Sequence, residues 1–190
     1  MSINLKKGQQ ISLDKEAPDL EAGFIGLGWD ISQNGSNYDL DASAFLVNEN
    51  DELVSDSHLI FYNNPKSPDP DNSIEYMGDN RTGAGEGDDE VILINLPKVP
   101  EKVRKIVITV SIHEGDEKGQ SFGQVQNAYV RLVNVKNKEE VVRYDLTEEH
   151  AGETAMIMAE LKRQGNSWRV HAVGSGYSGG LAALVERYST

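Results

Sequence analysis

Apolar and polar residues alternate with a period of two along most of the chain, which is typical of β-strands with one buried face. The clearest case is residues 103–113, where one face carries Ile106, Ile108, Val110 and Ile112. Residues 41–48 alternate too, with Ser43, Phe45 and Val47 on one face and Ala44 and Leu46 on the other. The same criteria predict strands over 10–14, 24–30, 58–63, 73–77, 91–96, 127–135, 141–146 and 168–173.

Two segments near the C-terminal end require a choice between helix and strand. Residues 153–162 are rich in Ala, Met, Glu and Leu, which favour helix, but the turn at 164–167 and the alternation beyond it favour a hairpin. We predict a strand there. Residues 179–189 predict a helix that Ser178 can cap. Its apolar stripe at helical spacing is Leu181, Leu184, Val185 and Tyr188.

About ten strands and one helix predict an all-β fold, a sandwich of two antiparallel sheets with a short C-terminal helix. At 190 residues, we expect a single domain over residues 1–190. Polar turns are expected at 14–21, 33–37, 49–52, 64–72, 114–120 and 136–138. Within 24–30, Gly26 and Gly28 indicate a bulge or a close approach of another backbone segment.

One stretch, residues 78–90, concentrates acidic residues and glycines. Its carboxylates are Asp79, Glu86, Asp88, Asp89 and Glu90, and Gly83, Gly85 and Gly87 alternate through it. Two like charges about 5 Å apart repel by roughly 1 kcal/mol in water, so this crowding is costly unless a cation is present. Calcium takes about six to eight oxygen ligands, and glycines let backbone carbonyls turn towards it.

The simpler interpretation of residues 78–90 is a solvated loop. Two features favour a metal site instead: the acids adjoin the buried-strand pattern of 91–96, and Asp39 and Asp41 form a second acidic element upstream. Neither element fits an EF-hand, because Ala44 and Asn50 stand where a loop opened by Asp39 needs Gly and Glu, and Arg81 stands at a ligand position after Asp79. We therefore predict a site assembled between strands, where Asp39 and Asp41 meet Asp88 or Asp89. Further candidates are Asp30, Asn80 and Glu86.

Composition narrows the classes of partner. Against 18 Lys and Arg, the chain has 31 Asp and Glu and a net charge of −13, which argues against nucleic acid or an anionic membrane surface as a partner. No apolar run reaches the roughly 18 residues of a membrane span, so we expect a cytoplasmic protein without membrane insertion. Absence of cysteine excludes thiolate ligands and thiol redox chemistry.

Two motifs near the C-terminal end do not support their usual functions. Residues 174–179 match G-x-G-x-x-G, but no acidic residue follows about 20 positions later, as a dinucleotide site requires. Residues 176–180 fit G-x-S-x-G, but no Asp or His follows Ser178. We interpret these glycines as a tight strand-to-helix corner. The four histidines lack ligand spacing, and His113 is noteworthy only because it ends a core strand beside Glu114 and Asp116.

Several motifs together resemble the TerD family of tellurium-resistance and general stress proteins. They are residues 26–30 (GLGWD), 39–45 (DLDASAF), 61–64 (FYNN), 78–83 (GDNRTG), 87–90 (GDDE), 120–125 (QSFGQV), 131–134 (RLVN) and 143–146 (RYDL). The resemblance runs nearly end to end. It implies a β-sandwich that binds two calcium ions through Asp39, Asp41, Asp79, Asp88, Asp89 and Glu90. It also implies a bacterial cytoplasmic protein that responds to tellurite and other stresses beside other tellurium-resistance proteins, some of them membrane-associated.

Three functional hypotheses follow. The first is a non-enzymatic module in which calcium orders residues 78–90, which we call the acidic loop, and creates a docking surface. The second is a metal-assisted hydrolase of phosphate esters, in which His113 carries the proton; this requires a cleft beside His113. The third is an assembly protein in which calcium bridges chains. Because the chain has no cysteine, it cannot reduce tellurite with its own thiols.

Overall fold

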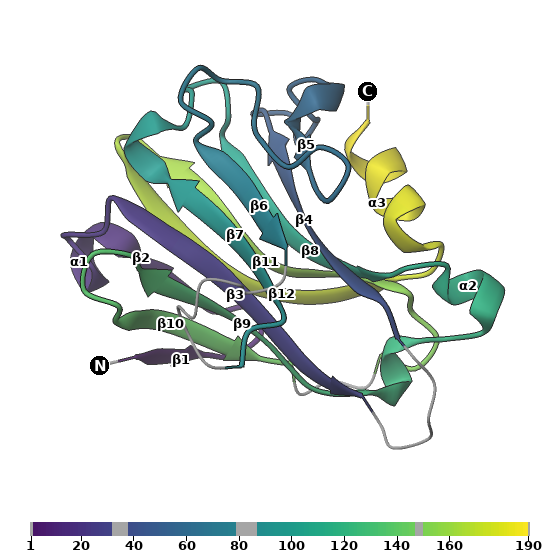
Figure 1. The fold of residues 1–190 in the computed structure, drawn as a ribbon. Coiled ribbons are helices and arrows are strands. Elements are labelled where there is room, and N and C mark those ends of the chain that lie inside the picture. The colour runs from purple at the N-terminus through teal and green to yellow at the C-terminus, as the bar shows by residue number, and fades with distance from the viewer. Residues whose placement is uncertain (1, 32–37, 79–86, 147–149, 190) are drawn as a thin grey trace.

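The computed structural model describes residues 2–31, 38–78, 87–146 and 150–189 (Figure 1). Within these ranges the strands form two six-stranded sheets that face each other, so the predicted sandwich is confirmed. Sheet A has the order β1 (Ile3–Leu5), β10 (Glu140–Asp145), β9 (Val125–Asn134), β3 (Ala22–Ile31), β7 (Glu90–Asn95), β6 (Ile74–Gly78). Sheet B has the order β2 (Gln10–Ser12), β12 (Ser167–Tyr177), β11 (Ala155–Gln164), β8 (Lys105–Ile112), β4 (Leu40–Val47), β5 (Leu59–Ile60).

The core lies between the sheets, where the alternation of the sequence places its apolar faces. Ile106, Ile108, Val110 and Ile112 of β8 and Ala44 and Leu46 of β4 all belong to it, as predicted. Phe45 and Val47 face the opposite way and form a second apolar cluster on the outer surface of sheet B. Helix α3 (Gly180–Tyr188) covers that cluster with the predicted stripe of Leu181, Leu184, Val185 and Tyr188.

Strand β11 is confirmed where the residue preferences conflicted. It lies between β12 and β8 in the middle of sheet B. One face contributes Met156 and Leu161 to the core between the sheets, and the other contributes Ile157 to the cluster beneath α3. Burial on both faces stabilises an extended conformation that propensity alone does not favour.

Three local predictions were wrong. The strand expected over 58–63 is only Leu59–Ile60, because the side-chain amide of Asn64 donates to Leu59 O (2.7 Å) and turns the chain back. Helix α2 (Gly115–Lys118) occurs within a segment expected as a turn, and helix α1 (Leu13–Glu16) replaces the end of the strand expected over 10–14 and the start of the turn after it. Ser178 does not cap α3, since its hydroxyl donates to Gly152 O, while Gly180 N–H donates to Thr154 Oγ1 (2.9 Å).

Strand β1, which the sequence did not predict, runs parallel to β10, whereas the other pairings between the described strands are antiparallel. Three-residue 3₁₀ turns occur at Asp56–His58, Leu96–Lys98 and Phe122–Gln124. The glycine-rich segment between β12 and α3 forms the expected corner, with Gly179 and Gly180 at positive φ. In the described part of the chain, no helix has the length and apolarity needed to cross a bilayer.

Candidate functional site

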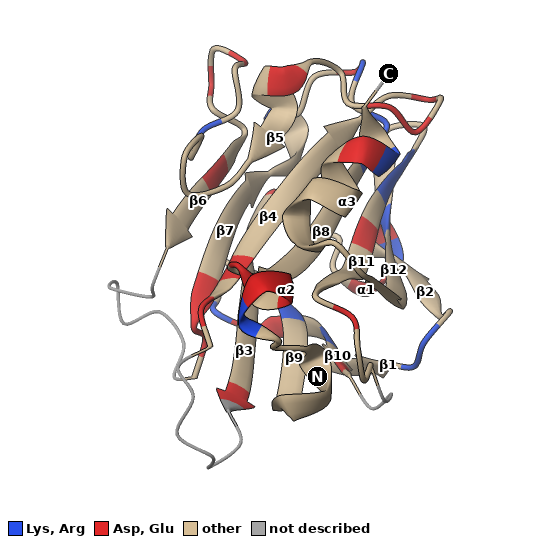
Figure 2. Cartoon of the chain, turned by 90° about the vertical axis from the view of Figure 1, so that its right-hand side faces the viewer, with Lys and Arg blue, Asp and Glu red and all other residues tan. Residues whose placement is uncertain are grey.

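Acidic residues that are far apart in the sequence gather at one end of the sandwich, which we call the acidic end. Figure 2 shows Asp and Glu around the lower ends of β3, β4 and β7 and on α2. The topology explains this arrangement, because β7 begins beside the end of β3 and β4 begins beside the end of β8. The predicted acidic ligands at or next to these strand ends are Asp30, Asp39, Asp41, Asp88, Asp89 and Glu90.

Asp88 is the most firmly held of the predicted ligands. Its side chain is completely buried, and Arg131 on β9 donates to it from Nη2 (2.8 Å) and Nε (2.9 Å). Tyr129, two residues earlier on the same face of β9, donates its hydroxyl to Asp88 Oδ1 (2.8 Å). Burial alone would lower the pKa of Arg131, but the hydrogen bonds to Asp88 raise it above its ordinary value. Burial, followed by the bond to Asp88, raises the pKa of Tyr129.

Two glycines of β3 make room for this arrangement. A Cβ at Gly26 would collide with the Asp88 carboxylate, and a Cβ at Gly28 would collide with the carbonyl of Gly87 and the ring of Tyr129. The pairing of β3 with β9 also shifts register between Gly28 and Asp30. Both interpretations of these glycines, a bulge and a close approach, are therefore confirmed.

Asp89 and Glu90 continue from Asp88 into β7. The Asp89 Oδ2 atom accepts a hydrogen bond from the backbone N–H of Trp29 (2.9 Å), and Asp89 N donates to Leu27 O (2.7 Å). Glu90 is buried and stands opposite Leu27 in the ladder between β3 and β7. These bonds join the start of β7 to the end of β3.

Asp41 lies on a different sheet, on the outer surface of β4 beside Ser111 of β8. Its Oδ2 is 3.4 Å from His113 Nδ1, and its side chain is 16 % exposed. Burial, and then the charge of neighbouring Asp39, raise the pKa of Asp41 above its ordinary value, while His113 partly opposes this. The backbone carbonyl of Asp39 accepts a hydrogen bond from His113 N (2.7 Å).

Of the remaining predicted ligands, the structure describes only Asp30. Asp30 is exposed and accepts a hydrogen bond from Asn127 Nδ2 (2.7 Å), whereas Asp79, Asn80 and Glu86 lie outside the described residues. Within the described ranges, no three His, Asp or Glu side chains lie close enough together to hold a metal ion. The structure therefore brings the acidic strands to one end but does not bring Asp41 to Asp88.

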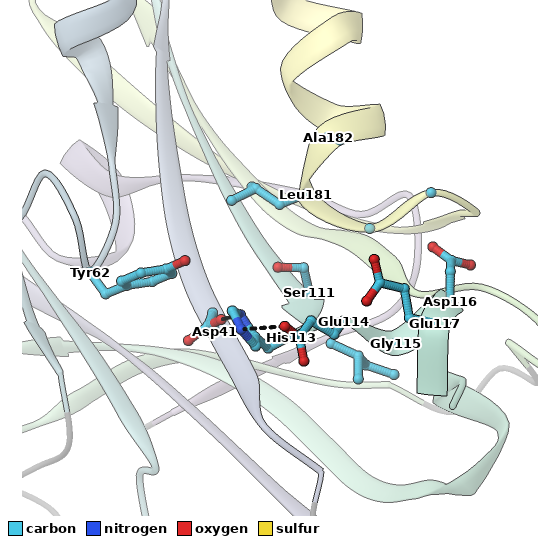
Figure 3. Close-up of a pocket in the computed structure, with 13 residues that line it drawn as sticks. Asp41, Tyr62, Ser111, His113, Glu114, Gly115, Asp116, Glu117, Leu181 and Ala182 are labelled. Atoms are coloured by element: carbon cyan, nitrogen blue, oxygen red, sulfur yellow. Dashed lines mark ion pairs between the residues drawn. The ribbon is translucent and has the colours of Figure 1, made fainter. Parts of the chain in front are cut away.

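A pocket of about 260 Å³, which we call the His113 pocket, opens at the acidic end beside the start of α3 (Figure 3). Its walls come from β4, β8, α2 and α3 and from Tyr62. The cleft beside His113 that a hydrolase would need is therefore present. Four carboxylates line it, however, and they would repel a phosphate ester: Asp41, Glu114, Asp116 and Glu117.

Sequence reasoning did not predict the roles of Tyr129 and Arg131. Both lie on the outer face of β9, a strand that was predicted correctly. The only signal in the sequence was that these two polar side chains alternate with apolar residues along the strand. Arg143 on β10 stacks 3.8 Å from the centre of the Tyr129 ring and extends the polar surface. No sequence spacing links β9 to Asp88, because the contact spans 43 positions.

Comparisons with known proteins match this chain over nearly its whole length. The family model described as "TerD domain" matches residues 1–188. The tellurium resistance protein TerD of Serratia marcescens is 50 % identical over 189 residues, covering 99 % of this chain and 97 % of that protein. General stress protein 16U of Bacillus subtilis is 44 % identical over 190 residues, covering 99 % of this chain and 97 % of that protein.

A solved structure shares the fold. The crystal structure of a homologue of telluride resistance protein (TerD) from Streptomyces coelicolor superposes with a TM-score of 0.67. It covers 90 % of this chain and 99 % of that one, at 22 % sequence identity. At that identity the likeness supports the sandwich alone.

Proposed function

This chain belongs to the TerD family of tellurium-resistance and general stress proteins, and from that premise we propose that it is a calcium-binding, non-enzymatic module of the bacterial stress response. It acts in the cytoplasm, where calcium creates a docking surface at the acidic end. Its partners are other tellurium-resistance and stress proteins, some of them membrane-associated. The two relatives carry the names of a resistance protein and a stress protein and not of enzymes, which supports a non-enzymatic role.

The chemistry of the donors at the acidic end fits calcium. All are carboxylate or amide oxygens, the ligands that a hard cation prefers, and the chain has no thiolate that would favour a softer metal. When bound, calcium would supply positive charge to a surface on which carboxylates otherwise repel one another. The observation that carries the proposal is the gathering of Asp and Glu residues from β3, β4 and β7 at one end of the sandwich (Figure 2).

The residues have different parts in this proposal. Asp79, Asp89 and Glu90, with Asn80 and Glu86, would hold an ion at the acidic loop. Asp88 supports the end of that loop through Arg131, which already neutralises its charge. Asp39 and Asp41 would hold a second ion on the other sheet, and Asp30 is a further candidate.

Calorimetric titration and thermal denaturation test the proposal. Calcium should bind and raise the melting temperature, since a hundredfold excess over Kd stabilises by about 2.7 kcal/mol. Asp89→Asn should weaken binding and reduce the rise. The control is Asp56→Asn, which removes an exposed aspartate from the 3₁₀ turn before β5. Equal melting curves for the native protein in calcium and in chelator would exclude calcium binding.

Hydrolysis of phosphate esters is the second candidate, because the His113 pocket provides a cleft. Its carboxylates disfavour an anionic substrate unless a cation bridges the two. Release of p-nitrophenol from p-nitrophenyl phosphate by the calcium-loaded native protein, abolished in His113→Gln, would favour this candidate over the module.

A further inference from the structure

The His113 pocket lies on the outer face of sheet B beneath the start of α3. Its floor is the end of β8, and Leu181 and Tyr62 stand on either side of its opening (Figure 3). Asp88, Asp89 and Glu90 lie instead at the start of β7, which belongs to sheet A. The pocket therefore needs an explanation of its own.

Its charge favours a cation. Four carboxylates line it, and the basic groups nearby offset them only in part: Lys118 pairs with Glu114 (3.1 Å), and His113 faces Asp41 (3.4 Å) and Glu114 (3.8 Å). The start of α3 adds roughly half a positive charge. Asp116 accepts a hydrogen bond from Thr154 Oγ1 (3.0 Å), which fixes its position but leaves its charge. The surplus is negative.

The side chain of Ser111 provides an independent indication of a ligand. Ser111 lines the pocket, is only 3 % exposed, and makes no side-chain hydrogen bond with any described residue. Figure 3 shows its side chain between Leu181 and His113, inside the pocket. A polar side chain in so buried a position is costly unless a hydrogen-bonding partner reaches it.

The walls suit an alkyl chain rather than a bare ion. Tyr62 is 44 % exposed, with its ring edge-on to His113 at 6.3 Å between centres, and Leu181 faces it across the opening. An aromatic face attracts an organic cation and also contacts its carbon atoms. No three of the described acidic and histidine side chains converge closely enough to hold a metal ion, although the pocket has room for several heavy atoms.

We propose that the His113 pocket binds a primary ammonium group carried on a short alkyl chain, as in a diamine or a lysine side chain. The ammonium group lies among Asp41, Glu117 and the Ser111 hydroxyl, and the alkyl chain lies between Tyr62 and Leu181. An ammonium group has three donors and no acceptor, so it matches carboxylates and an open hydroxyl acceptor. This assignment does not depend on calcium binding at the acidic loop, but it uses Asp41, so the ammonium group would compete with the second calcium ion proposed at Asp39 and Asp41.

The test is a titration of ¹⁵N-labelled full-length protein, followed by NMR, with cadaverine in one arm and N-acetyl-lysine methylamide in the other. Shifts should concentrate at residues 111–117 and 179–182. Binding of both probes indicates that a lysine side chain can enter, whereas binding of cadaverine alone assigns the pocket to free amines. Either result supports the proposal.

Two exposed positions serve as matched variants. Glu117→Gln should weaken cadaverine binding about fivefold, or about 1 kcal/mol, because it removes one carboxylate from the pocket. Glu49→Gln makes the same change at an exposed position in the turn after β4 and should have no effect. Tyr62→Leu should also weaken binding.

Three outcomes would overturn the proposal. The neutral analogue 1-pentanol could shift the same residues as strongly as cadaverine, which would mean that the charge is irrelevant. Calcium alone could shift them while cadaverine does not, which would make the pocket a metal site. Cadaverine could also bind equally well to the native protein and to Glu117→Gln, with both folded by their spectra.

Discussion

Asp88→Asn should destabilise the protein even without calcium, because Asp88 is first of all the buried partner of Arg131. Removing one member of a buried ion pair costs about 3–5 kcal/mol. Asparagine keeps the shape and one acceptor oxygen, and Arg131 still has Glu140 Oε2 at 3.3 Å from Nη1. We therefore expect a loss of about 2–3 kcal/mol in the free energy of unfolding.

Urea denaturation at pH 7 in chelator measures this effect, with the midpoint expected to fall by about 1 M. Asp145→Asn is a closely matched control. Asp145 also pairs with an arginine at 2.8 Å, but its side chain is 51 % exposed. Solvent-exposed pairs contribute about 0.2–1 kcal/mol, so the control should change the midpoint little.

The comparison has a clear refuting result. If Asp88→Asn costs no more than Asp145→Asn in chelator, the buried pair does not stabilise the fold. If the variant then also loses its response to calcium, Asp88 acts as a calcium ligand rather than as the support of the acidic loop. A large loss in chelator with calcium binding retained would confirm the division of roles proposed above.

Two further predictions follow from the structure. Gly26→Ala places a methyl group against the Asp88 carboxylate and should lower the free energy of unfolding, measured in urea, by about 1–3 kcal/mol. If that collision is the cause, the double variant Gly26→Ala, Asp88→Gly should be no less stable than Asp88→Gly alone. Burial alone would raise the pKa of Glu160, but Lys162 and then Lys105 hold it below the ordinary value of 4.5. Its contribution to stability should therefore be full above about pH 4.5 and fall as the pH drops through the lower folded pKa, and Glu160→Gln should flatten that part of the stability–pH curve.

Periodicity was sufficient for most of the sandwich, because alternation reports which face of a strand is buried. It located both faces of β4, the core face of β8 and the stripe of α3. It was less decisive for the segment of β11, where the residue preferences favour helix. It also does not show where a side chain bonds to the backbone, as the side chain of Asn64 does where β5 ends after two residues.

The candidate site was predictable in composition but not in geometry. Residue types and local spacing placed Asp88, Asp89 and Glu90 beside a core strand and Asp41 at a strand entrance. Which side chains meet depends on strand order, which one sequence does not reveal. The pairing of β3 with both β7 and β9 brings Arg131 to Asp88, and the placement of β4 in sheet B separates Asp41 from both.

The short strand β1 has a consequence for self-association. Among the described residues, Ile3, Asn4 and Leu5 pair with the edge of β10 that faces away from β9, and Leu5 is the buried member of the three. If this segment detached, the backbone donors and acceptors of β10 would become available to a neighbouring molecule. Strand β1 thus covers this edge of sheet A, and variants that remove or displace it should be checked for edge-to-edge polymerisation.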